Sequence, residues 1–439
     1  MARVIDQGSR LSAVRLAGQH AICDLINLSR FDEDDLYANL DWLSDNQREI
    51  EKKIFKLRYN DKFKPKLYLY DVTSSYLEGV KNELGDWGYN RDGKRGKKQI
   101  VIGLLTDGEG EPVSVEVFKG NTSDIKTFLS QVKKVAQDFG IEEVTMVGDR
   151  GMIKSEQVKD LKEHNFHYIT ALTKSQIETL LDDKIIQMEL FDEKICEVEN
   201  DNIRYILRRN PVRVEEIENN RQSKIRKIKT KMAQHNKYLE EHLKAGVKTA
   251  YKKIKVLIEQ LKLSEFISIK VDGRKLSLDI DLDKKAENTL LDGCYVIKTD
   301  LTKEQVSCET VHQRYKDLAM VEQGFRTMKT GLLETRPIYV QKEKRTRGHV
   351  FVVMLAYSII RELKKLWKNI DLTIEEGINE LNTICCMDIS IKGTLCRHIP
   401  EPREMGQKLL KTANVILPEV LPNRGVVVAT RKKLVGERK

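Results

Sequence analysis

Three carboxylates in this 439-residue chain have neighbours that would place them on rigid elements. Asp71 follows the strand-like run LYLY, and Asp149 follows the strand-like run VTMVG. Glu322 lies within the helical pattern of residues 315–329, YKDLAMVEQGFRTMK. Acids at the ends of two strands and on a helix can converge on a pair of divalent metal ions, because Mg²⁺ prefers carboxylate oxygens. This arrangement is typical of phosphoryl transfer with two metals.

The helical segment 315–329 has a polar stripe beside an apolar face. At about 100° per residue, the stripe contains Tyr315, Glu322, Arg326 and Lys329. The apolar face is formed by Leu318, Val321, Phe325, Met328 and Leu332. An acid at the rim of a buried face is held rigidly. The alternative for Glu322 is an exposed ion pair with Arg326, which is worth only a few tenths of a kcal/mol.

The same segment matches a family signature. Tyr315, Glu322 and Lys329 have the spacing of the motif Tyr-x2-Arg-x3-Glu-x6-Lys, and Leu318 stands at the Arg position. Other motif segments occur in the family order: LYLYDVTSSYLEG, FKGNTSD, VGDRGM and RGHVFVVMLAY. Over most of its length the chain therefore resembles a large group of bacterial DDE-type insertion-sequence transposases.

This resemblance implies a function, a cofactor and partners. The implied function is divalent-metal-dependent DNA cleavage and strand transfer at the ends of an insertion sequence. Asp71, Asp149 and Glu322 would be the catalytic residues and the metal ligands. The expected cofactor is a pair of Mg²⁺ ions, for which Mn²⁺ would substitute, and no nucleotide cofactor is expected. The expected partners are double-stranded DNA and further copies of the chain, in a homodimer or a larger synaptic complex.

The resemblance also implies DNA-binding residues. In the family the matching Tyr and Lys contact the DNA strand near the cut, which implies the same role for Tyr315 and Lys329. Lys329 lies two helical turns from Glu322, about 10 Å along the helix, and is too far away for direct pairing. Leu318 cannot take the role of the family's Arg. We predict that Arg326, on the same polar stripe, takes that role in DNA binding.

The order of the elements indicates an α/β fold. Strand patterns occur at 67–71, 99–105, 112–118, 144–148 and 167–172, and helical patterns follow residue 124 and residue 155. This alternation predicts a mixed sheet flanked by helices, and the resemblance implies an RNase H-like core. We interpret Asp124 as a helix cap. The glycines and basic residues of loop 85–98 suit a segment that lies near phosphates.

Five segments follow from this pattern. They are an N-terminal helical segment (1–65), the first part of the catalytic core (66–172), an α+β insertion with basic helices (173–292), the second part of the core (293–369) and a C-terminal tail (370–439). The insertion would separate the fifth strand from the helix that carries Glu322. Because family members usually carry more chain upstream, the resemblance also implies that part of the N-terminal region is missing.

Positive charge is concentrated in one stretch. Residues 221–262 contain thirteen Lys or Arg and three acids, a net charge of +10 that equals the charge of the whole chain. A basic arm on a neutral body predicts salt-dependent contact with a polyanion such as DNA. The alternative is a solvated helical hairpin whose lysines serve only solubility.

Several classes of protein are excluded by what the sequence lacks. The seven cysteines lack the spacing of a disulfide framework, and the sequence shows no signal-peptide pattern. No apolar run is long enough to span a membrane. These features predict a soluble cytoplasmic protein. The sequence has no P-loop and no dinucleotide-binding glycine motif. Two alternative functions remain: a metal-dependent nuclease without strand transfer, and a non-catalytic DNA-binding remnant of a transposase.

Overall fold

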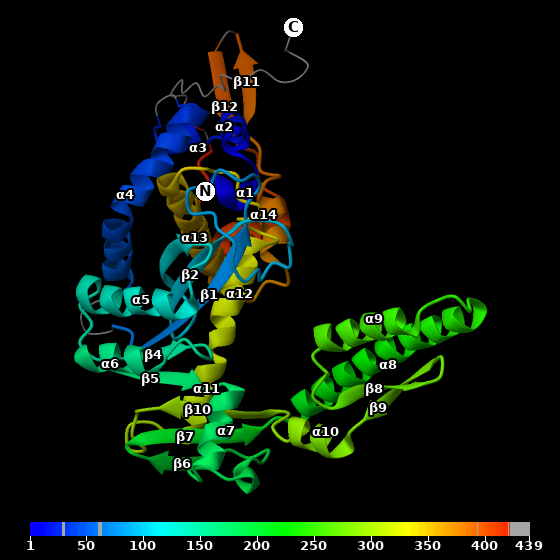
Figure 1. Ribbon diagram of the computed structural model, residues 1–439. Coiled ribbons are helices and arrows are strands. Elements are labelled where there is room, and N and C mark those ends of the chain that lie inside the picture. The colour runs from blue at the N-terminus through cyan, green and yellow to red at the C-terminus, as the bar shows by residue number, and fades with distance from the viewer. Residues whose placement is uncertain (29–30, 60–63, 393, 420, 422–439) are drawn as a thin grey trace. The chain divides into compact units, whose positions relative to one another are not determined.

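Five strands form a mixed sheet in one of the two units of this protein (Figure 1). The computed structural model describes residues 1–28, 31–59, 64–392, 394–419 and 421. The first unit comprises Met1–Thr170 and Gln313–Lys439, and the second comprises Ala171–His312.

The sheet of the first unit has the order β3-β2-β1-β4-β5. Its strands are β1 (Leu67–Tyr76), β2 (Gln99–Asp107), β3 (Pro112–Lys119), β4 (Val144–Gly148) and β5 (Phe166–Ala171). The first three strands are antiparallel, whereas β1, β4 and β5 run parallel. Helices make the parallel connections, as parallel pairing requires. The predicted α/β core, a mixed sheet flanked by helices, is confirmed.

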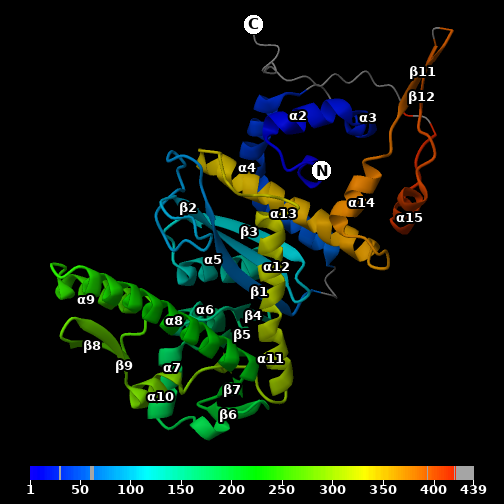
Figure 2. The same cartoon turned by 90° about the vertical axis from the view of Figure 1, so that its right-hand side faces the viewer.

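Helices cover the two faces of this sheet. α5 (Asp124–Asp138) and α6 (Ser155–Glu163) pack against a core that includes Tyr68 and Tyr70 of β1. Successive side chains of a strand point to opposite faces, so Asp71 faces away from this core. α12 (Leu318–Lys329) packs against β1 and β2, and α13 (Glu343–Leu366) packs against β3 (Figure 2). Asp71 therefore points toward the layer that contains α12.

The first strand is longer than the sequence predicts. The predicted strand ends at Asp71, but β1 continues to Tyr76 because its second half pairs with β2. The parallel pairing with β4 covers residues 67–70, so Asp71 lies where β1 and β4 diverge.

The predicted helix 315–329 is divided into two. α11 (Cys308–Lys316) and α12 are separated by Asp317, whose carbonyl accepts a hydrogen bond from the Met320 amide three residues on, at 2.8 Å. This tighter turn resembles a 3₁₀ turn and interrupts the regular α-helical pattern. Leu332 lies beyond the end of α12, whereas the rest of the predicted apolar face is buried.

The helices α4 (Glu33–Arg58) and α13 pack unusually closely. A Cβ atom on Gly348 would lie 2.1 Å from the backbone oxygen of Leu40, so a side chain at this position cannot fit without separating the helices. Most of residues 349–360 in α13 faces the interior.

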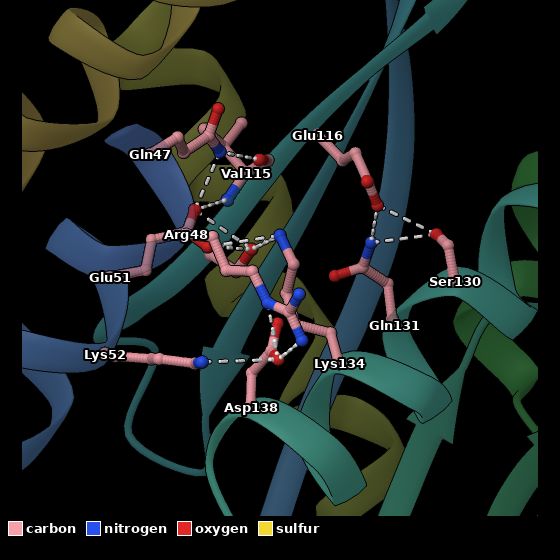
Figure 3. Close-up of polar contacts among 11 residues, drawn as sticks. Gln47, Arg48, Glu51, Lys52, Val115, Glu116, Ser130, Gln131, Lys134 and Asp138 are labelled. Carbon is pink, nitrogen blue, oxygen red and sulfur yellow. Dashed lines mark hydrogen bonds and ion pairs between the residues drawn. The ribbon is translucent and has the colours of Figure 1, made fainter. Parts of the chain in front are cut away.

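A buried polar cluster joins α4, β3 and α5 (Figure 3). Glu51 accepts hydrogen bonds from Ser114 Oγ at 3.1 Å and pairs with Lys134 at 3.1 Å. Its side chain is 1% exposed and that of Lys134 is 14% exposed. Burial raises the pKa of Glu51, and Lys134 opposes this shift. The cation therefore offsets part of the cost of burying this carboxylate between the helix and the sheet.

We expect Lys134→Met to lower the free energy of unfolding by about 3 kcal/mol, because it leaves the Glu51 carboxylate buried without a cation. The loss is expected to be larger at pH 8 than at pH 5, since protonation of Glu51 at low pH removes the unpaired charge. Urea unfolding at both pH values measures it. Lys133→Met, at an exposed position on the same helix, is the control, and equal losses in the two variants would contradict the expectation.

The rest of the first unit lies toward the chain ends. It contains α1 (Ala2–Ile5), α2 (Arg10–Gln19), α3 (Ile22–Leu25), α14 (Ile374–Leu381), the hairpin of β11 (Met387–Ile391) and β12 (Thr394–His398), and α15 (Glu404–Thr412). Part of the predicted C-terminal segment, residues 422–439, lies outside the described residues.

The second unit, Ala171–His312, contains the segment 173–292 that is predicted as an insertion, together with residues 293–312, which are predicted as part of the core. Its strands β10 (Cys294–Thr299), β7 (Ile203–Arg209) and β6 (Cys196–Asn200) are antiparallel in that order. Its other elements are α7 (Lys174–Asp182), a 3₁₀ turn (Met188–Leu190), α8 (Pro211–Glu241), α9 (Val247–Gln260), the hairpin of β8 (Ile267–Asp272) and β9 (Lys275–Ile280), and α10 (Leu282–Thr289).

The basic stretch 221–262 forms much of α8 and α9, which share an apolar core with β8 and β9. Most of its lysines and arginines are exposed, but Arg221 is buried and pairs with Glu218 and Asp292. In the part of the chain that the structure describes, no helix combines the length and apolar character needed to cross a membrane.

Candidate active site

The three predicted acids come from three elements of the first unit. Asp71 lies within β1, Asp149 directly follows β4, and Glu322 lies on α12. In the parallel pairing Tyr70 stands opposite Gly148, so the two aspartates are the next residues on adjacent strands. An apolar run precedes each acid, and the two runs form adjacent buried strands of the parallel part of the sheet. The register therefore brings the ends of the two runs side by side.

The charges of Asp149 and Glu322 both act on Asp71. Burial raises the pKa of Asp71 to about 7, with smaller contributions in the same direction from Asp149 and Glu322. The backbone N–H of Val72, which donates to Asp71 Oδ1 at 2.7 Å, and the charge of Arg91 oppose the shift. Asp71 is therefore a half-buried acid without enough positive charge around it.

The acids fit a divalent cation by the chemical type of their side chains. Hard cations prefer carboxylate oxygens, and a cation here would offset the repulsion that raises the pKa of Asp71. Within the described residues, no group of three or more His, Cys, Asp or Glu side chains is arranged to hold a metal ion. Asp149 and Glu322 are both exposed, so their side chains have freedom to move toward Asp71.

Tyr315, on α11, lies beside the second acid. Its hydroxyl donates a hydrogen bond to Asp149 Oδ1 at 3.2 Å, which is long for a bond between two oxygens. Burial and the Asp149 charge raise the pKa of Tyr315, so the hydroxyl remains protonated and able to donate at neutral pH. Tyr315 can therefore orient Asp149.

Lys329 does not point freely into solvent. Its Nζ pairs with Asp92 at 2.6 Å and donates to Thr73 Oγ1 at 3.0 Å. Thr73 and Asp71 are two residues apart on β1 and share one face of the sheet. Lys329 therefore lies next to the predicted triad, although its charge is compensated by Asp92.

Asp92 anchors loop 85–98 to the end of α12. Its carboxylate is 1% exposed, pairs with Lys329 and Arg336, and accepts the backbone N–H of Tyr76 at 3.0 Å. A carboxylate that compensates two cations at once holds the loop, the strand and the helix end together. The sequence did not indicate this role for Asp92.

We expect Asp92→Asn to lower the free energy of unfolding by about 3 kcal/mol, because two largely buried cations then lose their shared partner. Chemical unfolding of purified protein measures the loss. Asp86→Asn makes the same charge change in the same loop and serves as the control. An Asp92→Asn variant as stable as this control would show that the ion pairs contribute nothing.

Two further residues singled out by the sequence, Arg326 and Asp124, have different outcomes. Arg326 is exposed on α12, one turn beyond Glu322, where a nucleic acid strand can reach it. Asp124 is not the N-cap of α5, since Ser123 occupies that position, and the interpretation as a cap is wrong. Its carboxylate instead binds Arg91 Nη2 at 2.8 and 2.7 Å.

Arg91 is a residue of the site that sequence reasoning missed. Its charge lowers the pKa of Asp71, so it lies close to the predicted triad. The basic composition of loop 85–98 was the one available signal, and it did not single out Arg91 among its neighbours.

Comparisons with known proteins give one extensive match. Residues 62–359 match the family described as "Transposase DDE domain". A search of curated proteins gives no match.

Two solved structures are similar at low levels. The piggyBac transposase synaptic complex with hairpin DNA is 8% identical with a TM-score of 0.34, covering 89% of this chain and 84% of that one. The Mos1 transposase paired-end complex with the left transposon end is 15% identical with a TM-score of 0.18, covering 28% of this chain and 41% of that one. With both TM-scores below 0.5, neither similarity carries an argument.

The family match spans well over half of the chain and includes β1, β4 and α12, the elements that carry Asp71, Asp149 and Glu322. The chain therefore belongs to the family of proteins with a transposase DDE domain.

Proposed function

We propose that this protein cleaves DNA at the ends of an insertion sequence and joins those ends to target DNA, in reactions that depend on divalent metal ions. The observation that carries this proposal is the half-buried Asp71, which stands beside Asp149 in the register of β1 and β4 and whose pKa is raised to about 7 by partial burial and by the charges of Asp149 and Glu322. Strongly perturbed acids are concentrated at functional sites. Family membership indicates which chemistry such a group of acids performs.

Asp71, Asp149 and Glu322 would hold the metal ions, with two Mg²⁺ as the natural cofactor and Mn²⁺ as a substitute. Metal ions bound there supply activation of the attacking hydroxyl and neutralisation of charge on the phosphoryl oxygens. Tyr315 keeps Asp149 in position through its hydrogen bond. The half-buried setting of Asp71 reduces contact with water on one side of the site, which strengthens electrostatic interactions there.

DNA is the proposed partner, in a homodimer or a larger synaptic complex. Tyr315, Arg326 and Lys329 would contact the strand near the cut, and Lys329 would do so from beside Asp92. The exposed cations of α8 and α9 support a further contact with the DNA backbone. Affinity that depends on such cations falls steeply as salt concentration rises.

A strand-transfer assay tests the proposal. The protein is incubated with Mg²⁺, linear DNA that ends in the termini of the element encoding it, and a supercoiled target plasmid. Joined products, absent when EDTA is added, are the expected result. Cleavage without joined products would indicate a nuclease, and DNA binding without cleavage would indicate a non-catalytic remnant.

A further inference from the structure

A cavity of about 270 Å³ lies in the first unit beyond the end of α12, and its lining is rich in positive charge. The cavity lies between the N-terminal end of α2, the segment 334–340 and the start of α13. Three arginines line it, Arg3, Arg10 and Arg336. None of the residues assigned to the catalytic site lines this cavity.

Arg3 is buried with one of its donors unused. The residue is 8% exposed, and its Nη1 donates to the backbone oxygen of Gln7. Its Nε–H is buried and has no hydrogen-bond partner among the residues that the structure describes. An unpartnered donor on a buried cation is costly, because such a group has lost its water without gaining an acceptor.

Arg10 adds a second charge beside the first. Its Nη2 lies 2.8 Å from His349 Nδ1, and His349 Nε2 lies 3.3 Å from the backbone oxygen of Thr335. The imidazole therefore accepts from Arg10 and donates to Thr335, which requires the neutral ring. Burial and the two arginines lower the pKa of His349 to about 3, so it stays neutral at physiological pH.

The negative charges of this cluster act on Arg3 rather than on Arg10. Burial and the charge of Arg10 lower the pKa of Arg3 to about 10. The opposing carboxylates are Asp6, which also accepts a hydrogen bond from Ser12, and the exposed Glu334. Two like charges therefore remain close together in a partly closed cavity.

The chemistry of the lining selects an oxyanion. Guanidinium groups bind phosphate oxygens through paired, charged hydrogen bonds. The cavity is also lined by Gly8, Ser9 and Arg10 at the start of α2, and a helix N-terminus favours negative charge. Arg336 connects this cavity to Asp92 and thus to Lys329, at the end of the helix that carries Glu322.

We infer that this cavity binds a phosphate group through Arg3 and Arg10, and that the group is a backbone phosphate of the DNA held at the active site. Binding of a phosphate anion follows from the cavity itself. The identification of DNA as its source rests on the proposed function. The anion accepts a hydrogen bond from the unpartnered Nε–H of Arg3. Its negative charge also reduces the repulsion between Arg3 and Arg10.

The first experiment measures thermal unfolding of the full chain in sodium phosphate and in sodium chloride at equal ionic strength. Phosphate is expected to raise the unfolding temperature, as any ligand of the native state does. Arg10→Gln is expected to weaken phosphate affinity about tenfold or more, because a charged hydrogen bond is lost. Arg10→Lys keeps the charge and should retain part of the effect.

Arg15→Gln is the matched control, with the same charge change on the same helix at a residue outside the cavity. The control should respond to phosphate as the unaltered chain does. The absence of a phosphate effect in the unaltered chain, or an equal effect in Arg10→Gln and Arg15→Gln, would overturn the site. Arg3→Gln provides a second variant if Arg10→Gln does not fold.

The second experiment identifies the source of the phosphate. Duplex DNA binding is measured across a salt series for Arg10→Gln and Arg15→Gln. Loss of one phosphate contact should reduce the slope of log K against log salt by about 0.9 in Arg10→Gln relative to the control. Equal slopes would make free phosphate the ligand and overturn the DNA assignment. Failure of all DNA binding would refute the proposed function, while the phosphate experiment would still decide the cavity.

Discussion

Asp149→Asn and Glu322→Gln are each expected to abolish DNA cleavage while leaving DNA binding intact. Each change removes one charged ligand from the proposed metal site, and metal ions there contribute several kcal/mol of transition-state stabilisation. Since about 1.4 kcal/mol corresponds to a tenfold change in rate, cleavage should fall by about 10³-fold or more. Cleavage of DNA carrying the element's termini, followed over time in Mg²⁺ and in Mn²⁺, measures this loss.

Glu143→Gln supplies the control for these two variants. It removes an exposed carboxylate at the opposite end of β4 from Asp149, so it should cleave DNA at the rate of the unaltered chain. Binding of Mn²⁺, followed by calorimetry without DNA, should weaken in the two site variants and remain unchanged in the control. Cleavage by Glu322→Gln at the rate of the control would remove Glu322 from the triad.

Much of the core could be predicted from local sequence signals. The strand β4, the inserted strands β7 and β9, and the burial of α13 follow from apolar runs and periodicity, which depend on near neighbours. The capped start of α4 at Asp32 likewise follows from a short run of acids. The predicted length of β1 was too short, because the second half of this strand is stabilised by β2, a partner more than twenty residues away in sequence.

The parts of the site that could not be predicted depend on contacts between distant segments. Asp92 and Lys329 are far apart in sequence, and nothing in their spacing indicates the ion pair that joins loop 85–98 to α12. Arg91 likewise binds Asp124 and lowers the pKa of Asp71, and both partners are distant from it in sequence. The alignment of Asp71 with Asp149, by contrast, was accessible, because an apolar run precedes each acid.

Asp71→Asn is expected to stabilise the metal-free protein at pH 8, although it should inactivate the enzyme. The carboxyl of Asp71 has a pKa of about 7 in the folded chain against an ordinary value of 3.8. Between these values the folded state binds one more proton than the unfolded state, so stability falls as pH rises through this range. The asparagine variant has no proton to lose and should be more stable above pH 7, by at most about 4 kcal/mol.

The pH dependence distinguishes this effect from a general change in packing. Unfolding in urea, with EDTA present, should show the two proteins diverging from about pH 4 to pH 8, with the advantage of Asp71→Asn largest at the high end. Addition of Mg²⁺ should stabilise the unaltered chain more than the variant, because a ligand stabilises the state that binds it. A variant that is less stable than the unaltered chain at pH 8 would mean that the Asp71 carboxylate is satisfied by its protein neighbours, and the electrostatic argument for a metal site would fail.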